Sequence, residues 1–371
     1  MKKIKLLLVF ALLGLSLSAC TISVGSKSAI NTSDGGLWAS GDRGKTWKQV
    51  SQIPTVTGKA GSIGGTDIYS LEIDPQDSQT VYLGTAAHGM FYTYNIADGW
   101  WPVKALGQSN ITDIKVDPKN KCVIYTAITN RLLRSNDCGR TWQQVYYDNN
   151  PEVAVTSIAI DHYNSDNVYI STSRGEIIKS IDQGISWRTI KRLGTEVIKK
   201  LLIYPQDSRL IFVATNNNRI YSFRSNTITN VNDPKNIESN FSVSDWRDLG
   251  DVLSDFKLGD LFRDIIVSSN DGVLLLATSR GIVRSPDQGI TWESIDLLPD
   301  EKDAIINAIA ISPKNSQEIY YVTNTAFFGS TDGGVSWSTK KLSTSRIGWK
   351  LKVNYENTDL IYLGTRLIQT K

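Results

Sequence analysis

The chain of 371 residues is poor in the side chains that usually hold metals and redox groups. Three Cys and two His residues leave too little material for a zinc or haem site. The sequence also has no Gly-rich phosphate loop, no nucleophile elbow and no HExxH motif. It therefore predicts a protein without a metal or another cofactor.

Long apolar runs are also scarce, and the clearest one lies at the N-terminus. Basic residues precede an apolar run over residues 6–17, which is typical of a secretory signal and too short for an ordinary membrane span. The segment LSAC (17–20) resembles the bacterial lipobox, in which the cysteine is lipidated and the preceding residues are removed. The alternative is a plain signal peptide that happens to end in Cys20.

The lipobox resemblance implies how the N-terminal region is organised. Residues 1–19 are expected to be the signal peptide, Cys20 the lipidated residue, and residues 20–35 the lipidated cysteine with its polar tether. Thr21 follows the cysteine, which in diderm bacteria resembles proteins sent to the outer membrane. We expect an exported envelope protein anchored by lipid, in the outer membrane of a diderm and otherwise in the outer leaflet of the cytoplasmic membrane.

Neither sign of charge is in large excess. The formal net charge of +3 falls to zero without residues 1–19, because this segment carries three Lys and no acid. Bulk charge therefore argues against a nucleic-acid partner, and any electrostatic function must come from local clusters.

One short phrase, Ser-x-Asp-x-Gly-x-Thr/Ser-Trp, recurs through the chain. Its five copies contain the pairs Asp42 and Trp47, Asp137 and Trp142, Asp182 and Trp187, Asp287 and Trp292, and Asp332 and Trp337. The Asp and Ser side chains can accept hydrogen bonds from nearby backbone N–H groups, and the Gly can adopt a positive φ. A catalytic site is normally built once, so the phrase predicts a structural turn rather than an active site.

A second phrase, in which a turn separates two strand-like runs, occurs seven times. Its copies align on Ile73, Val116, Ile160, Ile203, Val267, Ile311 and Val353, with spacings of 43, 44, 43, 64, 44 and 42 residues. Each unit holds about four short strands with period-two alternation and little helical pattern. The repeat predicts an all-β fold, a single seven-bladed β-propeller at residues 36–371.

The last repeat stops before its fourth strand, so residues 36–50 are expected to complete it and close the ring. Closure in this way removes an exposed sheet edge. Either residues 36–41 or residues 366–371 fill the third position of that blade. In the second blade the strands are expected at roughly 111–116, 122–128, 131–135 and 141–146.

Two blades depart from the repeat. In the first, residues 94–103 are too short to form the eight-residue phrase, although Trp100 or Trp101 can still pack between blades. In the fourth, an insertion at residues 224–244 replaces the phrase. Such an insertion on a rigid scaffold is either functional or simply tolerated.

The eight-residue phrase resembles the Asp-box (BNR) repeat of sialidases, sortilin-type receptors, xyloglucan-cleaving hydrolases and photosystem assembly propellers. The resemblance covers about residues 36–371 and implies Asp boxes between the third and fourth strands, with each Trp packed between blades. Of these families, the photosystem assembly propeller has the most similar organisation: a single exported ring that holds protein partners through a basic face. The YLGT-type second strands look more like the sortilin and hydrolase repeats.

Two of the three cysteines fall within one blade. If the hairpin that turns near residues 129–131 is symmetric about Asn130, Cys122 and Cys138 lie opposite each other. An exported protein can keep a disulfide there. The alternative is a pair of inert thiols, because a register change of one residue would separate them.

Cationic side chains recur at one end of the predicted ring. Turns between second and third strands carry Arg131, Arg174, Arg219, Arg280 and Arg366. The starts of the innermost strands should form the rim of the central channel: Tyr69, Thr112, Thr156, Lys199, Arg263, Asn307 and Trp349, each followed by Ser70, Asp113, Ser157, Lys200, Asp264, Ala308 and Lys350. We interpret this face as an anion-binding surface with Tyr69 and Trp349 as aromatic anchors; the alternative is that the Arg residues only solubilise the repeat.

Enzyme functions fit less well. The Arg-Ile-Pro motif of sialidases is absent, and the similar xyloglucan hydrolases use two propellers facing each other, whereas this chain predicts one. Asp113 and Asp264 are the remaining candidates for a glycosidic carboxylate pair. No catalytic residue is assigned.

We therefore expect a monomeric, non-enzymatic binding or assembly scaffold of the cell envelope. Its partner is a protein or an anionic glycan bound through one propeller face. The alternative is a glycan-acting protein, either a sialidase-like or other glycoside hydrolase or a lectin.

Overall fold

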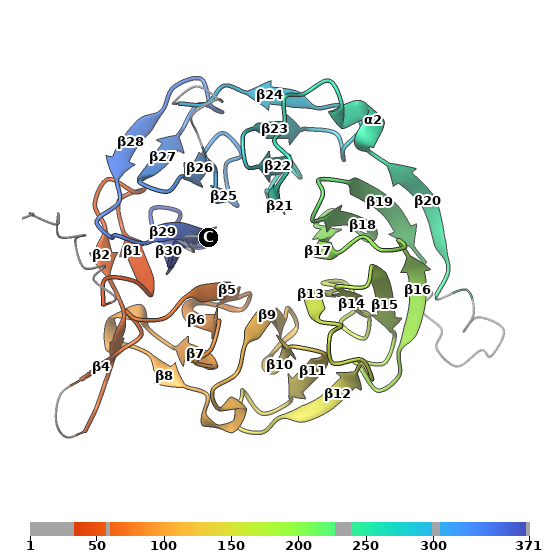
Figure 1. The fold of residues 1–371 in the computed structure, drawn as a ribbon, viewed down its shortest axis with the longest axis horizontal. Helices are drawn as coiled ribbons and strands as arrows, with labels where there is room; N and C mark the ends of the chain where they lie inside the picture. The colour runs from red at the N-terminus through yellow and green to blue at the C-terminus, as the bar shows by residue number, and fades with distance from the viewer. Residues whose placement is uncertain (1–32, 57–59, 227–238, 240, 299–304, 369–371) are drawn as a thin grey trace, which may run out of the picture. The chain divides into compact units, whose positions relative to one another are not determined.

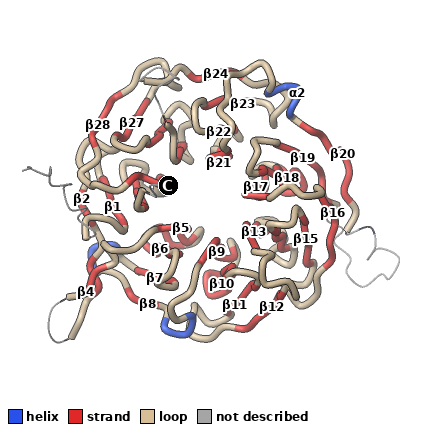
Figure 2. The backbone as a smooth tube through the Cα atoms, viewed as in Figure 1, coloured by secondary structure: helices blue, strands red, loops and turns tan. Residues whose placement is uncertain are grey.

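Seven four-stranded antiparallel sheets surround a central axis (Figure 1). The computed structural model describes residues 33–56, 60–226, 239, 241–298 and 305–368, which belong to one compact unit. Strands dominate it (Figure 2), with short helical turns at η1 (Ile96–Asp98), η2 (Lys104–Leu106) and α2 (Gly250–Leu253). The predicted seven-bladed β-propeller is confirmed. No helix in the described ranges is long and apolar enough to cross a membrane.

Six blades are continuous in sequence, and each runs from the axis outward. The first three comprise β5 (Ile68–Asp74), β6 (Asp77–Thr85), β7 (Met90–Thr93) and β8 (Trp101–Pro102); β9 (Ile111–Asp117), β10 (Asn120–Ile128), β11 (Arg131–Ser135) and β12 (Gln143–Tyr147); and β13 (Val155–Ile160), β14 (Val168–Thr172), β15 (Glu176–Ser180) and β16 (Arg188–Arg192). The next three comprise β17 (Ile198–Tyr204), β18 (Asp207–Thr215), β19 (Ile220–Ser225) and β20 (Val243–Asp248); β21 (Phe262–Val267), β22 (Leu274–Thr278), β23 (Ile282–Ser285) and β24 (Glu293–Ile295); and β25 (Ala308–Ile311), β26 (Ile319–Val322), β27 (Ala326–Ser330) and β28 (Ser338–Lys341). The second blade follows the predicted bounds closely.

The seventh blade joins the two ends of the propeller. β29 (Ile347–Val353) and β30 (Ile361–Arg366) pair with β1 (Leu37–Ser40) and β2 (Lys48–Gln49) in the order β2-β1-β30-β29. Leu37 lies opposite Gly364, and the backbone N–H of Thr365 donates to the Gly36 carbonyl at 2.9 Å. Residues 36–41 therefore supply the third strand of this blade. A small hairpin of β3 (Gln52–Ile53) and β4 (Gly61–Ser62) follows.

A buried arginine reinforces this closure. The Arg346 side chain is fully buried and forms an ion pair with Asp67 at 2.7 Å. It also donates to the carbonyls of Gly65 at 3.1 Å and Thr66 at 3.3 Å. Since the same Asp67 carboxylate accepts the backbone N–H of Leu367 at 2.8 Å, one charged pair ties the seventh blade to the first.

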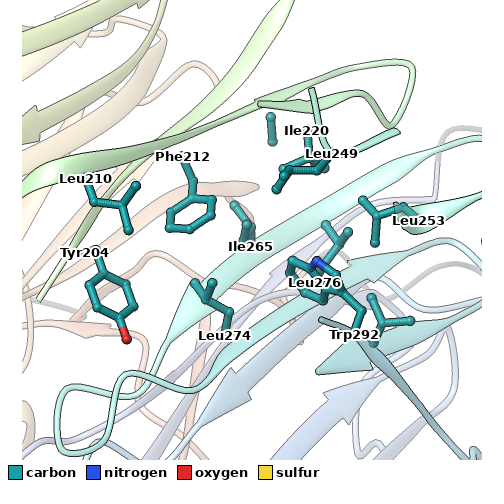
Figure 3. Close-up of a cluster of buried hydrophobic side chains, with 12 residues drawn as sticks. Tyr204, Leu210, Phe212, Ile220, Leu249, Leu253, Ile265, Leu274, Leu276 and Trp292 are labelled. Carbon is teal, nitrogen blue, oxygen red and sulfur yellow. The ribbon is translucent and has the colours of Figure 1, made fainter. Parts of the chain in front are cut away.

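The hydrophobic core lies between the blades. Seven clusters of buried apolar side chains occupy the seven junctions between neighbouring sheets. Figure 3 shows the cluster between the fourth and fifth blades, which combines Leu210 and Phe212 of β18 with Leu274 and Leu276 of β22. Alternate residues of each strand face opposite neighbours, so both faces of a sheet are apolar. This explains why second strands such as β14 are buried along their whole length.

The recurring phrase forms the turn between the third and fourth strands. In the second blade, Asp137 accepts hydrogen bonds from the backbone N–H of Thr141 at 2.8 Å and from its hydroxyl at 2.6 Å. The Ser135 hydroxyl donates to the same carboxylate at 2.8 Å and accepts the N–H of Gly139, whose φ is 84°. Hydrogen bonds from Thr141 lower the pKa of Asp137 to about 2. The same bonds recur in the other four copies, including those of Asp42 and Asp332.

The tryptophan of the phrase links its blade to the preceding one. The indole N–H groups of Trp187 and Trp337 donate to the carbonyls of Val145 and Asp296, both at 2.8 Å. The first blade has no Asp box, yet Trp100 takes the same role and donates to Val50 at 2.5 Å. Trp100 is fully buried in the cluster between the seventh and first blades, whereas Trp101 is 42% exposed.

Cys122 and Cys138 form a disulfide, but the predicted hairpin register is wrong. Ile124 pairs with Ser135 and Ile128 with Arg131, so the hairpin is centred between Thr129 and Asn130 rather than on Asn130. Cys138 reaches its partner because it lies in the Asp-box turn beyond β11, with a φ of 59°. Its backbone N–H donates to the Cys122 carbonyl at 3.0 Å.

The insertion of the fourth blade connects β19 to β20. Residues 227–238 and 240, most of the predicted insertion at 224–244, lie outside the described residues. Next to it, Asn226 donates to the Ser242 hydroxyl at 2.7 Å, which closes the base of the connection.

The two tryptophans of the first blade provide a matched test of this packing. We expect W100A to lower the free energy of unfolding by about 3–5 kcal/mol, because it leaves a cavity and an unpaired carbonyl at a blade junction. W101A should change it by about 1 kcal/mol or less, since Trp101 remains partly in water. Urea denaturation of both variants and the wild type measures the difference. Equal effects of the two substitutions would contradict the assignment of Trp100.

Candidate functional site

The starts of the innermost strands surround a cavity of about 550 Å³ at one mouth of the central channel. All seven residues predicted for the rim line it: Tyr69, Thr112, Thr156, Lys199, Arg263, Asn307 and Trp349. The residues that follow them also line it, namely Ser70, Asp113, Ser157, Lys200, Asp264 and Lys350. Ala308 is the exception, because its short side chain is buried in the junction between the sixth and seventh blades.

The cavity is strongly cationic. Seven Lys and Arg side chains line it, against two Asp side chains. The cations are Lys115, Lys199, Lys200, Arg263, Lys350, Lys352 and Arg366. A formally neutral chain beyond residue 19 thus concentrates positive charge at one place.

Deeper in the channel, cations are paired with carboxylates. The Lys115 ammonium lies 2.8 Å from Glu72 and 3.8 Å from Asp113, and Lys352 lies 3.8 Å from the same Glu72 oxygen. Lys200 forms an ion pair with Asp264. Burial disfavours the charge of Lys115, but Glu72 and Asp113 outweigh this and raise its pKa. Glu72 is therefore the carboxylate on which two lysines depend.

Lys352 differs from Lys115 although both face Glu72. Its side chain lies in the channel and is 48% exposed. Desolvation nevertheless lowers its pKa, with Glu72 opposing the change and Lys115 adding to it. The three lysines of the inner channel, Lys115, Lys200 and Lys352, are matched in number by the carboxylates of Glu72, Asp113 and Asp264.

At the mouth, four cations have no carboxylate partner among the described residues: Lys199, Arg263, Lys350 and Arg366. The guanidinium of Arg366 lies 4.4 Å from the ring centre of Trp349 and 5.8 Å from that of Tyr69. Arg263 approaches the same Trp349 ring at 5.9 Å and donates from Nε to the Ile306 carbonyl at 2.6 Å. Two arginines thus share one aromatic platform.

These two arginines are held in an unfavourable electrostatic setting. Burial and the neighbouring charge of Arg366 both lower the pKa of Arg263. The Nε of Arg366 is buried and has no hydrogen-bond partner within the described ranges. A bound anion would relieve the repulsion and supply an acceptor, so the mouth is suited to anion binding.

The two carboxylates considered for glycoside hydrolysis, Asp113 and Asp264, are already engaged by backbone N–H groups and lysines. Asp113 accepts the backbone N–H groups of Ile114 at 2.9 Å and Ile158 at 2.8 Å, one on each oxygen. Asp264 accepts the N–H of Ile265 at 2.9 Å and pairs with Lys200. Glycoside hydrolysis needs one carboxyl group that donates a proton and one free to act as a base or nucleophile. Asp113 and Asp264 are instead held as ion-paired acceptors.

The other turn arginines lie outside the cavity and divide into two groups. Arg174 forms ion pairs with Asp148 at 2.8 Å and Glu176 at 2.7 Å, and Arg219 pairs with Glu196 and Asp248, both at 2.7 Å. These two arginines are therefore committed to carboxylates of neighbouring strands and connections. Arg131 and Arg280 are exposed and form no ion pair with another described residue.

Sequence reasoning missed the second layer of the channel. Glu72, Lys115 and Lys352 form this layer. Each lies two residues beyond the second predicted rim position of its inner strand, namely Ser70, Asp113 and Lys350. Because side chains two apart face the same side of a strand, this alternation was the signal that could have found them. No group of three or more His, Cys, Asp or Glu residues that could hold a metal occurs in the part of the chain described here, and Cys20 lies outside it.

Family models match two parts of the chain. Residues 37–50 match the BNR-Asp box repeat, and residues 130–254 match Sortilin-Vps10, the sortilin or neurotensin receptor 3 model. The chain is an Asp-box β-propeller. No curated protein matches this propeller significantly.

Solved structures show the same fold at low sequence identity. The GH74 enzyme of Niastella koreensis is 15% identical, with a TM-score of 0.60, and the match covers 85% of this propeller chain and 53% of the enzyme. YCF48 bound to D1 peptide is 14% identical, with a TM-score of 0.59 and coverage of 86% and 96%. YCF48 from Cyanidioschyzon merolae is 12% identical, with a TM-score of 0.57 and coverage of 84% and 97%. The Asp-box propeller thus spans about half of the GH74 enzyme.

Removal of the shared carboxylate tests the charge arrangement of the channel. We expect E72Q to lower the free energy of unfolding by about 1–2 kcal/mol, because it takes a charged acceptor from Lys115 and Lys352. Adding K352M should recover part of this loss, since one uncompensated cation is then removed. Urea denaturation of the two single variants and the double variant completes the cycle. The exposed substitution E152Q is the control, and an E72Q curve equal to the control would contradict the assignment.

Proposed function

We propose that this propeller is a binding or assembly scaffold of the cell envelope, which holds an acidic segment of a protein partner at the channel mouth. The observation that carries the proposal is the pair Arg263 and Arg366 on the Trp349 ring, with no carboxylate partner among the described residues. A carboxylate of the partner would fit between like charges that repel each other. The aromatic platform would add apolar contact beside it.

The similarity to solved propellers supports this function only by analogy. In one of them, YCF48, a propeller of this size is bound to a D1 peptide. That structure indicates that a single ring of this fold can bind a peptide segment. For the present chain, the cations of the mouth favour a partner segment that is acidic.

The competing function is hydrolysis or binding of a glycan, since GH74 enzymes share the fold. The cavity supports it less well, because Asp113 and Asp264 are engaged by backbone N–H groups and lysines. Activity on xyloglucan that is lost in both D113N and D264N would establish the hydrolase and overturn the scaffold proposal.

Affinity capture from native envelopes tests the scaffold. We expect wild-type protein to retain an envelope partner at low salt and to release it as salt rises, because the contact is electrostatic. The double variant R263Q/R366Q should lose the partner, whereas R280Q should retain it. Arg280 is a matched control because it is an exposed arginine outside the cavity, without an ion pair in the described ranges. Capture that is identical for all three proteins would refute a partner site at the mouth.

The membrane anchor is a separate proposal that rests on the LSAC segment at residues 17–20. We expect Cys20 to carry the lipid, so that wild type takes up a labelled fatty acid and sediments with membranes. C20S should lose the label and appear in the soluble envelope fraction. An unlabelled wild-type chain with a mature N-terminus other than Cys20, read by mass spectrometry, would show a plain signal peptide instead.

A further inference from the structure

A second cavity lies away from the channel, between the first and second blades. Its volume is about 330 Å³, and we call it the tyrosine groove. Tyr82, Tyr92 and Tyr94 line one side, and the Asp-box turn at residues 138–140 forms the other. Lys104 and Arg140 complete its polar lining.

The groove is open because the first blade departs from the repeat. At the next junction, the Tyr125 hydroxyl donates to the Gln183 carbonyl at 2.9 Å, and Arg134 donates to the same oxygen at 3.1 Å. Tyr125 pairs with Arg134 across its sheet as Tyr82 pairs with Tyr92 in the first blade. In the first blade Tyr92 stands in place of Arg134, and among the described residues neither tyrosine hydroxyl bonds to the backbone carbonyl of Cys138, the residue equivalent to Gln183. The contact that closes the neighbouring junction is therefore missing here.

The short outer strand also exposes the groove. β8 has two residues, Trp101 and Pro102, whereas β12 of the second blade has five. As a result Tyr94, just beyond β7, is 56% exposed, and its ring packs edge-on against Tyr92 with centroids 5.2 Å apart. Tyr82 below them has a buried ring, and burial raises its pKa. Three phenols thus form a stepped aromatic wall.

The side chains of the groove offer more hydrogen-bond donors than acceptors. None of the three tyrosine hydroxyls bonds to another described residue, and Lys104 has no ion-pair partner in the same ranges. Arg140 uses one nitrogen to donate to the Asp137 carbonyl at 3.1 Å and keeps its other donors. No Asp, Glu, Asn or Gln side chain lines the cavity. The side chains therefore offer many donors, and the phenol oxygens are their only good acceptors.

We propose that the tyrosine groove binds a short, extended, proline-containing peptide segment that carries a carboxylate. Proline lacks a backbone N–H, and an extended polyproline segment presents carbonyls without internal hydrogen bonds. Such a ligand therefore offers many acceptors to the donors of the groove, which are the phenol hydroxyls, Lys104 and Arg140. Aromatic-lined grooves are a recurring binding mode for this conformation. The two cations select the acidic side chain by charge complementarity.

A glycan matches the donors and acceptors of the groove less well than a peptide does. Sugar hydroxyls donate as well as accept, so a glycan site needs carboxylate or amide acceptors beside its aromatic rings. The tyrosine groove supplies none from its side chains. The site is also independent of the proposed channel function, because no residue lines both cavities.

A hexapeptide phage library panned against the whole purified chain tests the proposal. We expect enrichment of sequences that combine proline with Asp or Glu. The most enriched peptide, fluorescently labelled, should bind about tenfold more weakly to Y94A, since an aromatic anchor is lost. Y147A is the matched control, because Tyr147 is 49% exposed on the second blade and lies outside the groove, and it should bind like the wild type.

Two further variants separate the contributions. R140Q should weaken binding and reduce its salt dependence, because one cation is removed. R263Q/R366Q should bind the peptide normally, which distinguishes this site from the channel mouth. Three outcomes would overturn the proposal: no enriched peptide, enriched peptides without proline and acid, or equal binding by Y94A and wild type. Glycan-array binding that Y94A abolishes would also overturn it and assign the groove to a sugar.

Discussion

Closure of the ring is the constraint on which the rest of the structure depends. The core lies between blades, so a blade without neighbours on both sides would expose an apolar face. Pairing of β1 with β30 completes the last sheet, and the buried Arg346–Asp67 pair ties it to the first blade. Because closure uses both ends of the propeller, the two junctions of the seventh blade with its neighbours depend on residues from both termini of the domain.

Closure also determines the chemistry at the axis. Seven inner strands converge there, and their first residues meet regardless of how far apart they lie in sequence. Lys199, Arg263 and Lys350 come together in this way and are joined by Arg366 from the end of β30, which concentrates like charge at a cost in electrostatic energy. Within the channel, carboxylates such as Glu72 offset that cost. At the mouth they do not, and this difference distinguishes a surface suited to an anion from a structural charge network.

The repeat made much of this architecture predictable from sequence. Its period predicted seven blades, and the position of each inner strand predicted all seven rim residues of the cavity. The pairing of individual side chains was not predictable, because Asp148 reaches Arg174 from the end of the second blade and Glu176 reaches it from the third. The centre of the hairpin near Cys122 was predicted half a residue too far along the chain. The turn has two residues, Thr129 and Asn130, whereas symmetry about Asn130 assumes an odd number of turn residues. The tyrosine groove lies where the first blade departs from the repeat, a departure visible in the sequence at residues 94–103, but the missing hydrogen bond to Cys138 was not predictable from it.

The central claim is that the channel mouth holds an acidic protein segment. Site-specific photocrosslinking in native envelopes tests it most directly, with a benzophenone side chain in place of Leu261, an exposed residue that lines the cavity. The same group in place of Ile290, an exposed residue of an Asp-box turn, serves as the control. We expect a crosslinked protein from Leu261 alone, with the crosslink mapped to a segment rich in Asp and Glu. Equal crosslinking from both positions, or a crosslinked segment without acidic residues, would contradict it.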